Sequence, residues 1–224
     1  MPTTNLPSLF SSPRSRLSLE RLRLKTRARD LLTTSYTKFW LAGHLNPTKP
    51  RPQLQRLRIA SVAKSLYEEM YSRFASGTLE TIRPKLCDSI RENLTARIMR
   101  RAPNTSLKWV LHRYIGSPRV VSHKFAPLTM GEDAAKASTM QQAVVKIRSV
   151  QSLQRLKRVR GQDGVVKEVL EEGSVGEGRE VLEYFVVQRM TRKGVVGEWM
   201  VWGTTEEKPV EEIVREMGKG RGKK

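Results

Sequence analysis

The chain has 224 residues, of which 42 are Lys or Arg and 22 are Asp or Glu, so its formal net charge is +20. No stretch reaches the ~18–20 apolar residues of a transmembrane helix. The single cysteine excludes an intrachain disulfide and a cysteine-based zinc site, and the sequence lacks the apolar core of a secretory signal peptide. The partner expected for so basic a chain is a polyanion, either nucleic acid or an anionic membrane surface.

The positive charge is concentrated in the first two thirds of the chain. Residues 1–67 carry 13 basic and two acidic side chains, and residues 68–160 carry 18 and seven. Residues 161–224 carry 11 and 13, which makes this last segment nearly neutral. We therefore expect the first 160 residues to face the polyanion and the C-terminal segment to complete a core.

Residues 1–53 are predicted to form a basic N-terminal extension. Within it, leucines recur every seven residues, at Leu17, Leu24 and Leu31, which predicts a helix over about 17–40. The composition is rich in Ser, Arg and Leu and almost free of acids. It fits a mitochondrial presequence, and it fits equally an extension that follows RNA phosphates. A solvated or cleaved tail is the plainer alternative.

A proline-rich linker ends this extension, because Pro47, Pro50 and Pro52 disfavour a helix and favour extended backbone. It is followed by a predicted globular domain over 54–217. The last seven residues, 218–224, are predicted to be a flexible basic tail.

Two amphipathic helices are predicted to open the domain. From Ile59 to Phe74 the apolar residues follow helical spacing, and Gly77 then provides a stop. A second helix is predicted over 78–101, with a break or kink near Pro84. The aromatic residues of the first helix are interpreted as core residues, and Cys87 as a small buried hydrophobe.

The apolar period then changes from helical to alternating, which indicates strands. Alternating segments are predicted at 107–115, 121–125, 143–147, 181–190 and 195–204, with loops at 127–139 and 168–178. Both faces of the last two strands are apolar, which is typical of strands that are covered on both sides. Pro209 is expected to open a short C-terminal helix. The pattern predicts an α+β fold in which two amphipathic helices pack on an antiparallel sheet of about four to five strands.

The sequence offers little for catalysis. It contains three histidines in no metal-binding spacing, no glycine-rich phosphate loop and no G-x-S-x-G motif. His112 and His123 fall on neighbouring predicted strands and could meet across them, so an enzyme with one of them as its base is kept as a minor alternative. We expect a protein that is not an enzyme and that has no metal, no cofactor and no small-molecule substrate.

The candidate sites are therefore cationic. A basic cluster over 148–160 contains no acid and no aromatic residue, so phosphate contact is favoured over base stacking, with a solvated strand end as the alternative. The residues predicted to bind RNA are Arg14, Arg16, Arg21, Arg23, Lys25, Arg27, Arg29, Arg51, Arg56, Arg58, Arg148, Arg155, Lys157, Arg158 and Arg160.

Four segments resemble one known family. They are LYEEMYSRFASG at 66–77, MQQAVVKIRSVQSL at 140–153, VLEYFVVQR at 181–189 and GEWMVWGTT at 197–205. They resemble the Tim-forty-four-like domain family, in its mitochondrial branch that includes large-subunit ribosomal protein L forty-five and the fungal membrane-associated ribosome receptor.

The resemblance implies a cone-like fold with a curved sheet, and a place on the mitochondrial large ribosomal subunit near the polypeptide tunnel exit. The partners that it implies are ribosomal RNA, neighbouring large-subunit proteins and, on the matrix side, the inner-membrane surface or its insertion machinery. The implied role is to position the ribosome for co-translational insertion. A peripheral inner-membrane ribosome receptor or a protein-import factor, not integral to the ribosome, is the alternative.

Overall fold

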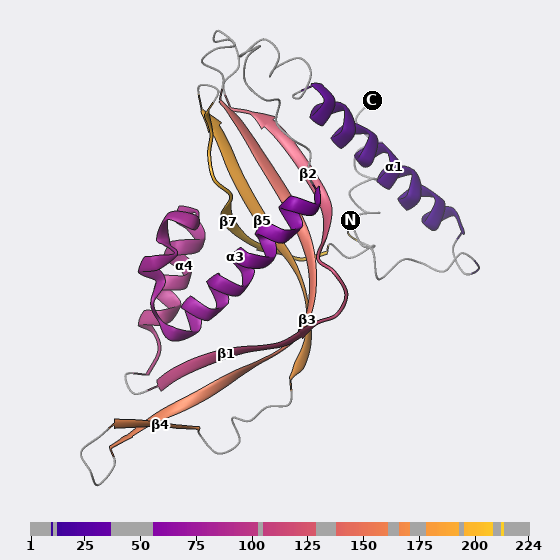
Figure 1. Cartoon of the computed structure of the whole chain (residues 1–224). Helices are drawn as coiled ribbons and strands as arrows, with labels where there is room; N and C mark the ends of the chain where they lie inside the picture. The colour runs from indigo at the N-terminus through magenta and orange to yellow at the C-terminus, as the bar shows by residue number, and fades with distance from the viewer. Residues whose placement is uncertain are drawn as a thin grey trace.

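The computed structural model describes Phe10, residues 13–36, 56–102, 105–128, 138–160, 166–170, 178–192 and 195–207, and Glu212. These residues form three α-helices, two 3-10 turns and one seven-stranded antiparallel sheet, so the predicted α+β class is confirmed (Figure 1). The helices and turns are α1 (Pro13–Tyr36), α3 (Arg56–Ser76), η2 (Leu79–Thr81), η3 (Arg83–Lys85) and α4 (Asp88–Met99). The strands are β1 (Thr105–Tyr114), β2 (Arg119–Pro127), β3 (Thr139–Arg160), β4 (Val166–Leu170), β5 (Arg179–Arg192), β6 (Val195–Val196) and β7 (Met200–Thr205).

The sheet is organised around β3, which is 22 residues long. Along one edge, β2 pairs with its first half and β1 with its second half. Along the other edge, β5 pairs with residues 139–151 and β4 with residues 156–160. β6 and β7 both pair with β5. The turn between β1 and β2 contains Gly116, whose φ of 76° lies in the left-handed region that favours glycine.

The strand number is larger than the four to five that the sequence predicts. The segment 148–160 continues β3 instead of ending it, and residues 166–170 return along it as β4, where a loop was predicted from residue 168 onward. The predicted strand at 195–204 is divided into β6 and β7. The division lies at Gly197, whose N–H donates to the carbonyl oxygen of Met190.

The helix α3 packs on one face of the sheet, which we call the inner face. Every third or fourth residue of α3 is buried, as the sequence predicts: Ile59, Ala63, Leu66, Tyr67 and Met70. They meet alternate residues of the strands, including Val145, Ile147, Phe185 and Val187, which are also buried. Each such apolar side chain contributes roughly 1.5–3 kcal/mol by burial, so this layer dominates stability.

The connection from α3 to α4 differs from the prediction of one helix over 78–101. Gly77 ends α3 with a φ of 78°, as expected. The chain then makes two 3-10 turns, with Pro84 inside the second one, and α4 begins only at Asp88. Arg101 fixes the corner, because its guanidinium donates to the carbonyl oxygens of Phe74 and Ala75 at 2.7 and 2.9 Å.

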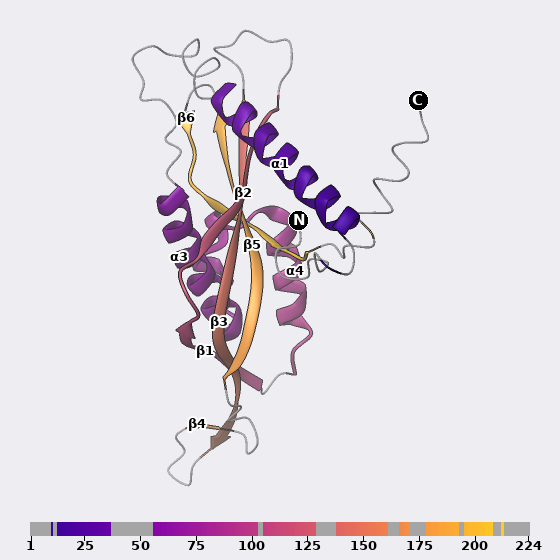
Figure 2. The same cartoon turned by 90° about the vertical axis from the view of Figure 1, so that its right-hand side faces the viewer.

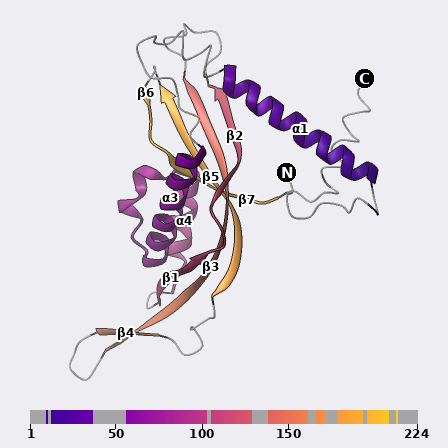
Figure 3. The same cartoon turned by 45° about the vertical axis from the view of Figure 1, so that its right-hand side comes forward.

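The helix α1 lies on the opposite side of the sheet from α3 and α4 and contacts β2 (Figures 2 and 3). It spans residues 13–36 where the prediction was about 17–40, and it begins at Pro13, whose fixed φ suits the first helical turn. Leu19 is the buried leucine of this helix, with 1% of its surface exposed. Within the described residues, no helix is both long and apolar enough to span a membrane.

Several predictions fall outside the described residues. They are the proline-rich linker, most of the C-terminal helix expected after Pro209, and the basic tail. The domain boundaries at residues 53 and 217 therefore stay predictions.

Candidate nucleic-acid interface

The face of the sheet turned away from α3, which we call the outer face, carries a group of cations. Lys146 and Arg148 alternate along β3 with the buried Val145 and Ile147, so their side chains point outward. Arg119 of β2 is paired directly with Lys146 and shares its face. We call the four residues Arg113, Arg119, Lys146 and Arg148 the outer basic patch.

Arg113 completes the patch from β1. It is paired with Val150, which lies two residues from Arg148 on the same face of β3. Arg113, Arg119 and Arg148 are exposed, and Lys146 is half-buried. Three strands thus present cations on one area of the outer face, because the register of β1 and β2 along β3 places these four side chains near one another.

Neighbouring side chains hold two of these cations in place. The Arg148 guanidinium pairs with the Glu180 carboxylate at 2.5 Å, and both side chains are about half exposed. Such a surface pair contributes at most about 1 kcal/mol, so its main effect is orientation. The Lys146 ammonium lies 5.8 Å from the centre of the Tyr184 ring. Arginine has five N–H donors, and the pair with Glu180 leaves some of them available to a phosphate.

The predicted cluster at 148–160 does not form one surface. Arg148 points to the outer face, and Arg155, seven residues further along β3, points to the inner side and is exposed. The backbone of Lys157, Arg158 and Arg160 belongs to the paired end of β3 and β4, and the register places Arg158 opposite Glu168. The side chains of these three residues lie outside the described part of the chain.

The predicted cations of the N-terminal extension lie on α1. Exposed ones are Arg14, Arg21, Lys25, Arg27 and Arg29. Arg16 and Arg23 are half-buried and pair with Glu20 at 3.4 and 2.9 Å. The helix therefore presents most of its positive charge to solvent on the same side of the sheet as the outer basic patch (Figure 3).

Three further predicted residues do not join the outer basic patch. Arg51 lies outside the described residues, and Arg56 begins α3 with a side chain that is not described. Arg58 is exposed on α3, on the inner side. Burial of Arg189, and then the nearby charge of Arg58, lower the pKa of Arg189. Arg189 itself donates to Gln141 at 2.5 Å and stacks on Trp199, so it is a structural residue.

Sequence reasoning missed Arg113, Arg119 and Lys146. Lys146 was visible as a polar position in an alternating strand, which is the signal for an outward side chain. Arg113 and Arg119 could not be assigned to the same area, because that depends on two β-bulges, after Leu111 and Val120, which shift the register against β3.

The histidines do not meet, contrary to the prediction that they could. β1 and β2 are not neighbours; they follow one another along the same edge of β3. His123 is paired with Ala143, whereas His112 bonds to Ser152 at 2.9 Å. These two places lie roughly 25 Å or more apart along β3.

Among the described residues, no group of three or more His, Cys, Asp and Glu side chains could hold a metal ion.

A polar network links α3 to the sheet. The Tyr67 and Tyr71 hydroxyls both donate to the Glu183 carboxylate, the latter at 2.5 Å. Trp109 donates to Gln151 at 2.8 Å, and Tyr67 also bonds to Gln151. Burial, and then Glu183, raise the pKa of both tyrosines well above 10, so they are neutral donors at physiological pH. The network ties the helix to the sheet.

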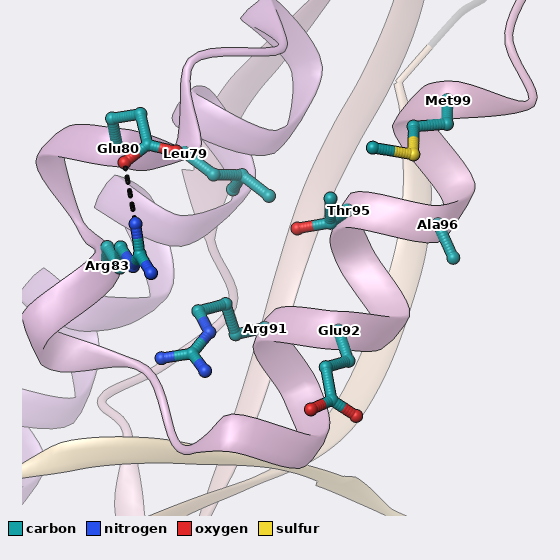
Figure 4. Close-up of a pocket in the computed structure, with 8 residues that line it drawn as sticks. All are labelled: Leu79, Glu80, Arg83, Arg91, Glu92, Thr95, Ala96 and Met99. Carbon is teal, nitrogen blue, oxygen red and sulfur yellow. Dashed lines mark hydrogen bonds and ion pairs between the residues drawn. The ribbon is translucent and has the colours of Figure 1, made fainter.

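A groove of about 400 Å³ lies between the two 3-10 turns and α4 (Figure 4). Its charged residues are of both signs: Arg83 pairs with Glu80, and Arg91, whose partner is Asp88, lies beside Glu92. Because the charges around the groove are balanced, the groove itself lacks the excess positive charge that a polyanion requires. The outer face and α1 are the better candidates.

Comparison with known proteins adds one finding. The family model described as "MBA1-like protein" matches residues 44–217, a range that includes α3, α4 and the whole sheet. None of the curated proteins matches the chain.

Proposed function

Because the chain belongs to the MBA1-like protein family, which is mitochondrial, associated with the inner membrane and related to the ribosome, we propose that it positions the mitochondrial ribosome at that membrane. In this proposal it binds the large ribosomal subunit near the polypeptide tunnel exit, from the matrix side, and contacts ribosomal RNA. Neighbouring large-subunit proteins and the insertion machinery are its further partners. We also propose that the chain is related to the Tim-forty-four-like domain family and to ribosomal protein L forty-five.

The outer basic patch is the observation that supports the proposed contact with RNA. Four cations from three strands lie on one face, with Glu180 as the paired acid among them. Phosphate contacts of this kind give affinity and orientation without base specificity, which suits a protein that stays at one place on a large RNA. The role is structural, and we propose no catalytic step; the separation of His112 from His123 supports this.

The test is co-sedimentation with the large subunit over a series of salt concentrations. In the test variant, Arg113, Arg119, Lys146 and Arg148 are each replaced by Gln. In the matched control, four exposed arginines away from the patch are replaced by Gln: Arg73, Arg83, Arg100 and Arg192. Each phosphate contact contributes about 0.9 to the slope of log affinity against log salt, so the test variant is expected to lower that slope by up to about 3–4 units.

The control is expected to keep the wild-type slope. Equal losses in both variants would show a response to net charge alone and would contradict the assignment of the patch. The same gradients distinguish an integral ribosomal component from a peripheral receptor or import factor. Co-migration that survives high salt supports a structural subunit, and release by salt while the protein stays on membranes supports a peripheral receptor or import factor.

A further inference from the structure

The helix α1 exposes most of its leucines. Leu17, Leu24 and Leu31 are 72, 64 and 57% exposed, and Leu32 is 71% exposed. Seven residues make almost two helical turns, so the first three lie in one row along the helix, with Ala28 between them. We call Leu17, Leu24, Leu31 and Leu32 the leucine stripe.

The opposite side of α1, which faces the sheet, is more polar. Besides the buried Leu19 and half-buried Leu22, it presents Thr26, Asp30 and Thr33. Both threonine hydroxyls donate to carbonyl oxygens of the preceding turn, Thr26 to Leu22 at 2.8 Å and Thr33 to Arg29 at 3.0 Å. A helix on the surface of a soluble protein turns its apolar side inward, so α1 has the reverse arrangement.

Cations border the leucine stripe on both sides. The helix holds seven basic and two acidic residues. Helical geometry places Arg14, Arg21 and Lys25 along one side of the row formed by Leu17, Leu24 and Leu31, and Arg27 along the other side. Glu20, the acid nearest the stripe, is already paired with Arg16 and Arg23. An apolar row between cations is the pattern of a helix that lies in the interface of an anionic membrane.

A groove of about 520 Å³ lies between α1 and β2, on the side of the helix that faces the sheet. Lys25 and Arg29 line it from the helix, and Lys124 lines it from the strand. All three side chains are exposed. Phe125 and Leu22 add apolar walls, and Asp30 is the one acid among the lining residues. Lys25 lines this groove and also borders the leucine stripe. The three cations therefore form a place for lipid phosphates that reaches the edge of the apolar row.

We propose that the leucine stripe and the groove of Lys25, Arg29 and Lys124 together bind an anionic phospholipid surface. The leucines enter the boundary between headgroups and acyl chains, and the groove takes headgroup phosphates. This inference rests on the proposed function, because it names the part of the molecule that faces the membrane. RNA is the less favourable occupant, because a phosphate backbone has no apolar surface that could bury the four leucines.

The test is flotation of the full-length protein with vesicles of phosphatidylcholine plus cardiolipin and with vesicles of phosphatidylcholine alone. The first variant replaces Leu17, Leu24 and Leu31 by Ser. Its matched control replaces three exposed leucines elsewhere, Leu128, Leu153 and Leu182. Loss of the apolar contacts is expected to weaken binding to cardiolipin vesicles by about 100-fold in the first variant and by less than about threefold in the control.

A second variant, Lys25→Gln with Arg29→Gln and Lys124→Gln, tests the groove. It is expected to lose about 10- to 100-fold of its affinity for cardiolipin vesicles at low salt and none of its weaker affinity for phosphatidylcholine. Added inorganic phosphate at equal ionic strength is expected not to compete. Competition by phosphate would identify a free anion as the ligand and would overturn the proposal.

Thermal unfolding and ribosome co-sedimentation of the same variants separate the two proposals. The inference is supported if the leucine variant unfolds and binds ribosomes like the wild type but fails to float. It is overturned if that variant floats normally, or if it loses ribosome binding while still floating, which would make α1 a contact to the ribosome. A wild-type protein that floats but does not bind ribosomes would contradict the proposed function alone.

Discussion

The helices α3 and α1 are both rich in apolar residues and both lie against the same sheet, yet they use those residues in opposite ways. In α3, Leu66 and Met70 are at most 5% exposed and fill the core. In α1, Leu19 is buried, while Leu17 and Leu24 are mostly exposed. Apolar content alone therefore does not separate a helix that builds the fold from one that offers a surface to a partner. The two kinds of helix are distinguished by whether the apolar side or the polar side of the helix faces the sheet.

The largest effect is expected from Leu66→Ala in α3. The substitution removes a buried side chain from the layer between helix and sheet and leaves a cavity, so the free energy of unfolding should fall by about 2–5 kcal/mol. Urea denaturation followed by circular dichroism measures it. A loss below about 1 kcal/mol would mean that α3 is not the core helix.

A smaller effect is expected from Leu19→Ala, the buried leucine of α1. We expect it to destabilise α1 by about 2 kcal/mol, mainly through local opening of the helix and less through the global transition. Hydrogen exchange of the α1 amides is the measurement, with the amides of α3 as the internal control. Unchanged protection in α1 would contradict the burial of Leu19.

An alkaline dependence of stability is expected from the tyrosines that bind Glu183. Their pKa is raised by folding, so the stability they confer is complete below pH 10 and is lost as the pH rises above it, where the unfolded tyrosines ionise. Relative to pH 8, the wild type should lose about 1.4 kcal/mol per tyrosine at pH 11, and Tyr71→Phe should lose that much less. Denaturation at both pH values tests this, and parallel profiles for the two proteins would refute it.

The smallest effect on stability is expected from Leu24→Ala, the same substitution as in α3 at an exposed position. We expect a change within about 0.5 kcal/mol, because little apolar contact is lost and alanine favours the helix. Denaturation under the conditions used for Leu66→Ala gives the direct comparison. A cost above about 1 kcal/mol would show that the leucine stripe is covered within the folded protein.

The sequence alone predicts the elements whose signal is local. The spacing from Ile59 to Phe74 together with Gly77 defines α3, and the alternation over 143–147 defines the centre of β3. The prediction fails where the signal depends on the rest of the fold. At Gln154, Arg155 and Leu156 the side chains of β3 are partly or fully exposed, so the alternation fades although the strand continues. The strand β4, which pairs with this end of β3, is therefore not recognised from the sequence.

The candidate surfaces are predictable to a similar degree. The seven-residue leucine spacing indicates a helix, but nothing local tells which leucine of the segment is buried. Only the folded chain shows that it is Leu19. The cations of α1 are evident from composition. The outer basic patch combines residues of three strands, and only the register along β3 shows that Arg113 and Arg119 share a face with Lys146.

The position of β3 also has a consequence for the order in which the protein folds. Among the described strands, β1 and β2 have no other hydrogen-bonding partner, and β5 depends on β3 for most of its pairing. During synthesis, α3, β1 and β2 therefore leave the ribosome before the strand that joins them exists. β1 and β2 stay unpaired until residues 139–157 have emerged. The sequence separation of the β1–β3 and β3–β5 pairs makes folding slow compared with a helical bundle of similar size.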